Sequence, residues 1–140
     1  MKLLCLLTPE EVQKIGRLPL KAICGEFESD EWLPEFFKVN PVFVDFMHSI
    51  IGTKGSSLSS LSEAARHQKE GYLYIIDFRT SEGIMGNVPD EDIVGAFKVE
   101  NGKVVENSYQ RNDLYKVFTK NGLVKLPPPL AELLIEELKR

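Results

Sequence analysis

The sequence has little of what metal-binding, nucleic-acid-binding or membrane proteins need. Its 140 residues include two cysteines and two histidines, and neither histidine has a neighbouring ligand at the spacing of a zinc site. The net charge is −4, so the chain lacks the basic surface that a phosphate backbone requires. No apolar run is long enough to cross a membrane. The sequence therefore predicts no metal site, no nucleic-acid partner and no membrane span.

The start of the chain also lacks a secretory signal. The apolar run Leu3–Leu7 ends at Thr8 and Pro9, short of a secretory core and without a small-residue cleavage site. Cysteines occur only at Cys5 and Cys24, so the dense disulfide framework of a small secreted domain is missing. These features predict a cytoplasmic protein with two reduced thiols.

The composition is that of an ordinary globular domain. Apolar residues make up 43% of the chain and charged residues 27%, which suffices for one core, so residues 1–140 are expected to form a single domain. Two capping boxes, Thr8 with Glu11 and Ser60 with Glu63, indicate helix starts. Helices are expected over Thr8–Gly16, Ser29–Val39, Asn40–Gly52, Ser60–Glu70 and Leu130–Leu138.

Strands are expected mainly in the second half of the chain. Tyr72–Phe78 is a continuous apolar run that predicts a central strand buried on both faces. Asn101-Gly102 and Asn121-Gly122 each lie between apolar runs and predict hairpins, the first with Glu100 opposite Lys103. No internal repeat is evident beyond these hairpins, and Arg17–Phe27 is expected to be mostly loop. Helices followed by antiparallel strands and a closing C-terminal helix predict an α+β fold.

Candidate chemistry gathers after the expected central strand. Asp77 and Arg79 stand at its end, and Glu82 follows in a short Gly-containing stretch, where polar side chains are well placed to line a cleft. The other interpretation is a structural ion pair between Asp77 and Arg79. A nucleophilic cysteine is disfavoured, because Cys5 lies in an apolar strand, and Cys24, expected nearer the surface, has a carboxylate close by that would raise its pKa.

The segment that includes these residues resembles the ADP-ribosyltransferase toxin superfamily over residues 56–99. The likeness is carried by Gly55-Ser56-Ser57, by the strand Tyr72–Asp77 and by Val88–Ala96. It implies NAD as a substrate and Glu82 as the catalytic glutamate that stabilises an oxocarbenium-like ribose. It also implies a cofactor site that includes Ser57, Asp77 and Arg79.

The chain departs from the pattern of that superfamily at two places. Its first strand offers only Lys2 where the family has an arginine, and Thr80 stands where Glu or Gln is common. The resemblance therefore implies either an NAD-dependent transferase or glycohydrolase, or a shared fold without that activity.

The competing hypothesis is a non-catalytic module that binds another protein, or a subunit of a larger assembly. Such a module would use an exposed sheet edge or an aromatic surface, for which Trp32, Phe36 and Phe37 are candidates. Core packing is the other interpretation of these three residues. No pattern in the sequence indicates the partner or the oligomeric state.

Overall fold

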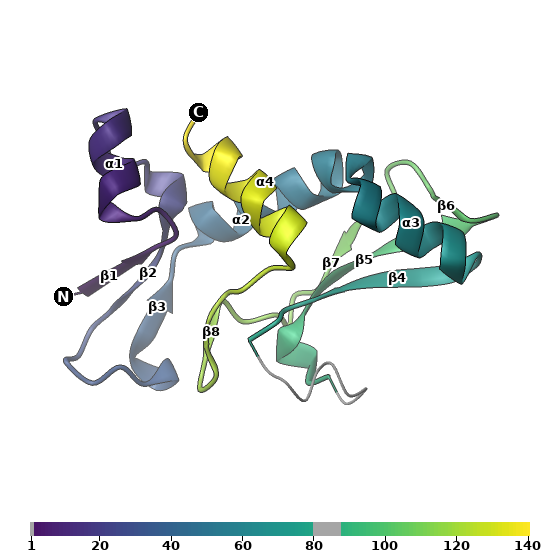
Figure 1. The fold of residues 1–140 in the computed structure, drawn as a ribbon. Coiled ribbons are helices and arrows are strands. Elements are labelled where there is room, and N and C mark those ends of the chain that lie inside the picture. The colour runs from purple at the N-terminus through teal and green to yellow at the C-terminus, as the bar shows by residue number, and fades with distance from the viewer. Residues whose placement is uncertain (1, 80–87) are drawn as a thin grey trace.

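Helices lie above two larger antiparallel sheets and a two-stranded one in the computed structural model, which describes residues 2–79 and 88–140 (Figure 1). The N-terminal sheet has the order β1 (Lys2–Cys5), β2 (Ile23–Phe27), β3 (Phe37–Val39). In the second sheet β4 (Gly71–Ile76) pairs with β5 (Ile93–Glu100), whose other side pairs with β6 (Lys103–Val104) and β7 (Gln110–Arg111). The α+β class is confirmed. The N-terminal sheet is an addition, because the sequence indicated only its first strand.

The helices are α1 (Pro9–Ile15), α2 (Pro41–Lys54), α3 (Ser59–Gln68) and the closing helix α4 (Pro128–Leu138). The capping box of Thr8 and Glu11 forms as expected, and Gly16 ends α1 with a φ of 82°. None of the helices among residues 2–79 and 88–140 is long and apolar enough to span a membrane.

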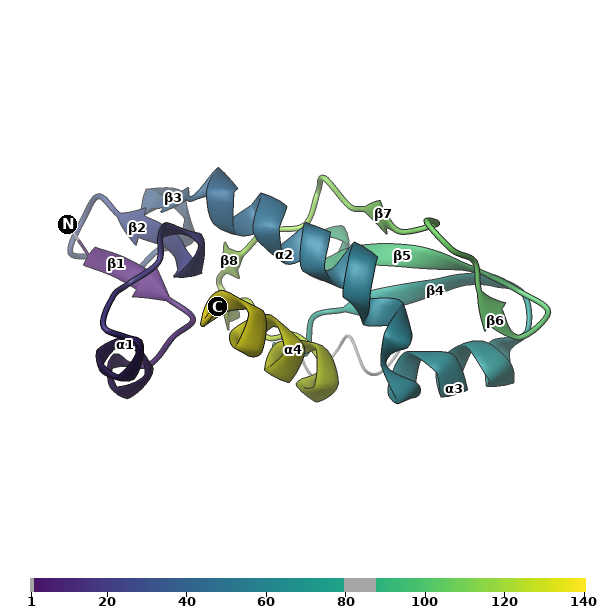
Figure 2. The same cartoon turned by 90° about the horizontal axis from the view of Figure 1, so that it is seen from above.

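Helix α2 is the centre of the core. Its side chains Phe43, Met47 and Ile51 are buried. Figure 2 shows α2 running from the N-terminal sheet toward α3, alongside α4, whose Leu134 and Leu138 belong to the same core. One apolar helix thus holds both sheets and the C-terminal helix together.

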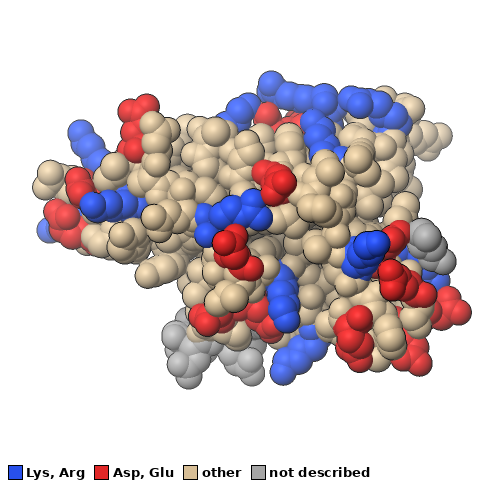
Figure 3. Space-filling model, turned by 180° about the vertical axis from the view of Figure 1, so that it is seen from behind, with Lys and Arg blue, Asp and Glu red and all other residues tan. Residues whose placement is uncertain are grey.

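Both hairpins are confirmed, although only the first turns at Asn-Gly: in the second the turn residues are Lys120 and Asn121, and Gly122 pairs with Thr119. Glu100 pairs with Lys103 across the first turn, as expected. The second joins β8 (Phe118–Thr119) to β9 (Gly122–Leu123) and is shorter than the apolar runs suggested. On the face shown in Figure 3, Lys and Arg side chains of the described residues gather along the upper edge, whereas Asp and Glu side chains are more frequent in the lower part.

Two expectations are wrong because tertiary pairing overrides local pattern. Residues 29–39 do not form a helix: Pro34–Phe36 is a single 3₁₀ turn, and the next three residues pair with β2 as β3. The strand β4 is not buried on both faces. It is an edge strand, and Tyr72 and Tyr74 are exposed on it.

The expected capping box at Ser60 and Glu63 does not form. Helix α3 begins at Ser59, and its N-cap residue is Leu58, which offers no side-chain hydrogen bond. The helix starts there because Gly55–Ser57 already forms a 3₁₀ turn that leads from α2 directly into it.

The structure contains an internal repeat, although none was expected from the sequence beyond the two hairpins. The pattern Pro, three residues, Ile, one residue, Gly, one residue, Phe occurs at Pro19–Phe27 and again at Pro89–Phe97. Both segments form a 3₁₀ turn followed by the central strand of a sheet, β2 or β5. Each pairs with a preceding strand that contains one register shift, β1 or β4.

An asparagine follows the strand that pairs with the other side of each central strand: Asn40 follows β3, and Asn112 follows β7. The two asparagines make the same hydrogen bonds. The Asn40 amide donates to the carbonyls of Leu20 and Ile23, at 3.0 and 2.8 Å. The Asn112 amide donates to the carbonyls of Asp90 and Ile93, at 2.9 and 2.8 Å. In each case the Oδ1 atom accepts from the backbone N–H two residues later. These matching bonds show that one backbone plan is used twice.

The repeat predicts equal losses from equivalent substitutions. Asn40→Ala and Asn112→Ala each remove three hydrogen bonds to backbone groups, so each is expected to lower the free energy of unfolding by about 2–3 kcal/mol. Urea denaturation measures both values. Asn121→Ala is the control, because Asn121 is exposed and only its backbone N–H is bonded. A large loss in one repeat alone would contradict their equivalence.

Candidate functional site

Asp77 and Arg79 do come together, in a buried network that holds the chain in place. The Arg79 side chain is only 2% exposed and lies 2.8 Å from Asp92 and 3.7 Å from Asp77. Its guanidinium also donates to the backbone carbonyls of Glu91, Lys116, Val117 and Gly122. The arginine is therefore saturated with internal acceptors, and the structural interpretation of this pair fits the geometry.

The carboxylate of Asp77 is equally occupied. Its oxygens accept from the backbone N–H groups of Arg79 and Lys125, and from the Tyr115 hydroxyl at 2.6 Å. Burial raises the pKa of Tyr115 well above its ordinary value, so the phenol keeps the proton that it donates. Asp92 and Tyr115 complete the network, and sequence reasoning gave neither of them this role.

Ser57, which the resemblance also implies, does not join this network. Ser57 lies beyond α2 and donates to the carbonyl of Lys54, at 2.6 Å. Its contacts include neither Asp77 nor Arg79. Glu82 lies outside the described residues.

The thiols are unsuited to nucleophilic chemistry. Cys24 is fully buried rather than near the surface, and burial raises its pKa to about 12. The pKa of Cys5 is also raised by burial. Within residues 2–79 and 88–140, no group of three or more His, Cys, Asp or Glu side chains is placed to hold a metal ion.

His48 is buried on α2 and paired with Tyr109. The distance from its Nδ1 to the tyrosine hydroxyl is 2.7 Å. Burial, and secondarily the positive charge of Arg111, lower the pKa of His48 to about 4. Burial raises the pKa of Tyr109, so the phenol keeps its proton. Nδ1 is the one acceptor that the described residues offer to this hydroxyl, so the phenol donates to it, and the imidazole is neutral at pH 7. Such a histidine is a poor proton acceptor and a good fixed hydrogen-bond donor.

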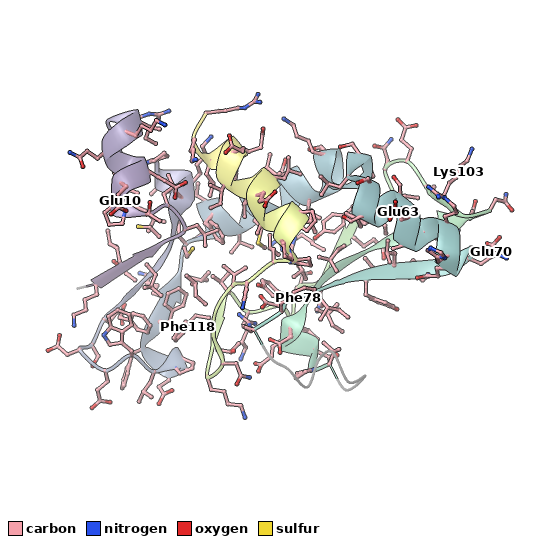
Figure 4. The ribbon with its side chains drawn as sticks, in the orientation of Figure 1. Glu10, Glu63, Glu70, Phe78, Lys103 and Phe118 are labelled. Carbon is pink, nitrogen blue, oxygen red and sulfur yellow. The ribbon has the colours of Figure 1, made fainter. Side chains whose placement is uncertain are left out.

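The aromatic residues of the segment before β3 divide between surface and core. Trp32 and Phe36 are exposed, whereas Phe37 packs against the core. Phe27, Phe37 and Phe118 form a ring cluster with centroids 5.1–5.3 Å apart. Phe118 comes from β8 and points toward the N-terminal sheet (Figure 4). This cluster joins the C-terminal hairpin to the first repeat.

The strand β4 has a free edge, because β5 pairs with only one of its sides. In an antiparallel ladder the N–H and C=O of alternate residues point to opposite sides. The Lys98 carbonyl accepts from the Val105 N–H on the β6 side of β5. The backbone N–H and C=O of Ala96, two residues earlier, therefore also point to that side, whereas those of Phe97 point to β4. Opposite Ala96, the N–H and C=O of Tyr74 must therefore point away from β5. The backbone of Tyr72 also points away from β5, because its carbonyl accepts from the side chain of Gln68 at 2.7 Å.

An almost wholly apolar groove of about 270 Å³ runs along this edge. One wall is α3, where the small residues Ser60 and Ala64 face the groove, and the other is β4. Pro127, Pro129 and Leu130 close the end beside Phe78, which Figure 4 shows where β4 ends. We call this feature the β4 groove. The sequence did carry one signal for it, because Tyr72-Leu73-Tyr74 alternates polar-tipped and apolar residues as a half-exposed strand does.

The buried network predicts a large loss on removal of its cation. Arg79→Leu leaves two carboxylates buried without an arginine and is expected to lower the free energy of unfolding by about 3–5 kcal/mol. Urea denaturation measures the loss. Lys98→Ala breaks an exposed pair with Glu100 and should cost less than about 1 kcal/mol. A small loss in Arg79→Leu would show that the network is not structural.

His48 predicts a pH dependence of stability. The folded pKa of about 4 lies below the ordinary value of 6.5, so below pH 6.5 the unfolded state binds more protons. Stability from this group is complete above pH 6.5 and is expected to fall by about 2–3 kcal/mol as the pH drops toward 4. Unfolding measured against pH should show this component in the wild type and in His67→Gln, where the exposed histidine is replaced. It should be missing from His48→Gln, and its persistence there would contradict the assignment.

Comparison with known proteins adds no relative to this geometry. No protein-family model matches the chain, and neither the curated proteins nor the solved structures contain a significant match. The geometry of the described residues is therefore the basis for a function.

Proposed function

We propose that this chain is a non-catalytic binding domain that takes an extended, apolar segment of a partner protein on the free edge of β4. The observation that carries the proposal is the open backbone of Tyr74, which faces an apolar groove. Proteins that add a peptide strand to a sheet edge use this combination: main-chain bonds give affinity, and pockets for alternate side chains give specificity.

Most of the β4 edge lacks the charges and prolines with which proteins protect a sheet edge. Gly71–Ile76 contains no charged residue and no proline, and its single register shift comes at the end, between Ile75 and Ile76. Tyr74 is 56% exposed. An edge of this kind favours pairing with another strand.

A single segment fits the β4 groove better than a second copy of the chain. The Tyr72 carbonyl is already bonded to Gln68, which leaves Tyr74 as the residue with both backbone groups directed to the open side. A stable dimer buries about 1,200–2,000 Å² in total, far more than this short edge offers. The cavity of about 270 Å³ has room for a few alternate side chains of one strand. The partner segment is therefore extended, with apolar side chains at every second position.

The chemistry of the described residues agrees with binding rather than catalysis. The two thiols, whose pKa values are raised by burial, are poor nucleophiles, and the neutral His48 is a poor base. Both cysteines are free, which fits a reducing, cytoplasmic location. NAD chemistry with Glu82 stays a prediction, to be tested by titration of NAD.

Peptide selection from a random displayed library tests the proposal. Wild-type protein is expected to select sequences with alternating apolar residues, and Ala64→Glu, which places a charge in the β4 groove, should weaken their binding at least about tenfold. Ser62→Glu is the matched control, because Ser62 lies on another face of α3 and does not line the groove. Calorimetry gives the affinities.

A second pair of variants separates the backbone from the side chain. Tyr74→Pro removes the outward N–H, a change that an edge strand tolerates, and should abolish binding, whereas Tyr74→Ala keeps the N–H and should retain part of it. The bound peptide should slow hydrogen exchange at the Tyr74 amide. Selected peptides that bind Ala64→Glu as well as wild type, or a dimer that forms through β4, would overturn the proposal.

A further inference from the structure

His48 offers a hydrogen-bond donor that the protein does not use. The residue is only 5% exposed, and Tyr109 is bonded to its Nδ1. Nε2 of His48 has no hydrogen-bond partner among the described residues. Every fully buried side-chain nitrogen or oxygen of those residues is bonded, so Nε2 is not fully buried. This atom must therefore open onto space that a ligand or water can reach. Because the tyrosine donates to Nδ1, the imidazole proton sits on Nε2 and points outward.

The space beside His48 is a cleft between the two repeats. It has a volume of about 570 Å³, within the range of small-molecule sites. Phe37 and Val39 of β3 line it on the side of the first repeat, together with Val44 of α2. Val117 and Phe118 line it on the side of the second. We call this feature the central cleft.

The charges at the rim of the central cleft balance. Arg111 and Lys116 are positive, and Glu35 and Asp113 are negative. Arg111 is already paired with Asp45 at 2.9 Å and with Asp113 at 3.5 Å. The rim therefore gives no net attraction to an ion of either sign, and a charged ligand would lose hydration without a free counter-charge at His48.

We propose that the central cleft binds an uncharged ligand with an apolar, ring-sized body and a carbonyl oxygen that accepts a hydrogen bond from Nε2 of His48. The apolar walls take the body, and the single buried donor fixes its orientation. This site is separate from the β4 groove and does not depend on the function proposed for it.

Three small probes test the chemical class. Acetophenone is neutral and has a carbonyl, α-methylstyrene has the same shape without the acceptor, and benzoate is an anion. In wild-type protein, acetophenone is expected to bind about 3- to 10-fold more tightly than α-methylstyrene, as one hydrogen bond allows, and more tightly than benzoate. It should also shift the Nε2–H signal of His48 in nitrogen–proton correlation spectra, together with the methyl signals of Val44 and Val117.

Two variants at His48 separate the donor from the shape of the cleft. His48→Leu removes the donor and should abolish the preference for the carbonyl. His48→Gln should restore it, because the glutamine amide can accept from Tyr109 and donate into the central cleft. Equal binding of acetophenone and α-methylstyrene to wild type, tighter binding of benzoate, or no shift at Val44 and Val117 up to the solubility limit would overturn the proposal.

Discussion

The contacts of the Arg79 guanidinium decide where the C-terminal third of the chain lies. One side chain bonds Asp92 before β5 and the backbone carbonyls of Lys116, Val117 and Gly122. Those carbonyls belong to the segment that carries Phe118 into the ring cluster of the first repeat. The same segment forms one wall of the central cleft and leads on to Pro127 at the end of the β4 groove. Both candidate sites therefore depend on this buried cation.

The repeat explains how one backbone plan supports two different environments. Gly25 and Gly95 occupy equivalent positions, and a Cβ at either would overlap an aromatic ring, Phe37 or Tyr109. In the first repeat the ring joins the aromatic cluster, whereas in the second its hydroxyl bonds His48. The backbone bond from the Asp77 N–H to the Asp92 carbonyl has an equivalent in the first repeat, from Leu6 to Ala22. Leu6 and Ala22 thus stand at the positions of Asp77 and Asp92, and Thr8 stands at that of Arg79. The ionic network is thus an addition to the second copy of a shared frame.

Local features could be read from the sequence, because their partners lie within a few residues. The capping box at Thr8, the Asn40 cap and the turn at Asn101-Gly102 formed as expected, and the second hairpin formed with Lys120 and Asn121 as its turn. The helix expected over residues 29–39 failed, since pairing with β2 outweighed the helical spacing of its aromatic residues. The repeat is hard to predict from the sequence because its two units share few residues. Their equivalence lies mainly in the bonds of Asn40 and Asn112.

The sequence by itself determined the fold class, the positions of the hairpins and the small net charge, which follow from composition and short-range pattern. Only the tertiary structure decided which atoms are used and which stay open. It closed Asp77 and Arg79 inside the protein, left the backbone of Tyr74 unpaired at an edge, and placed His48 beside the central cleft. The physical reason is that an open or a saturated group depends on neighbours from distant segments, and no local pattern records which neighbours those are.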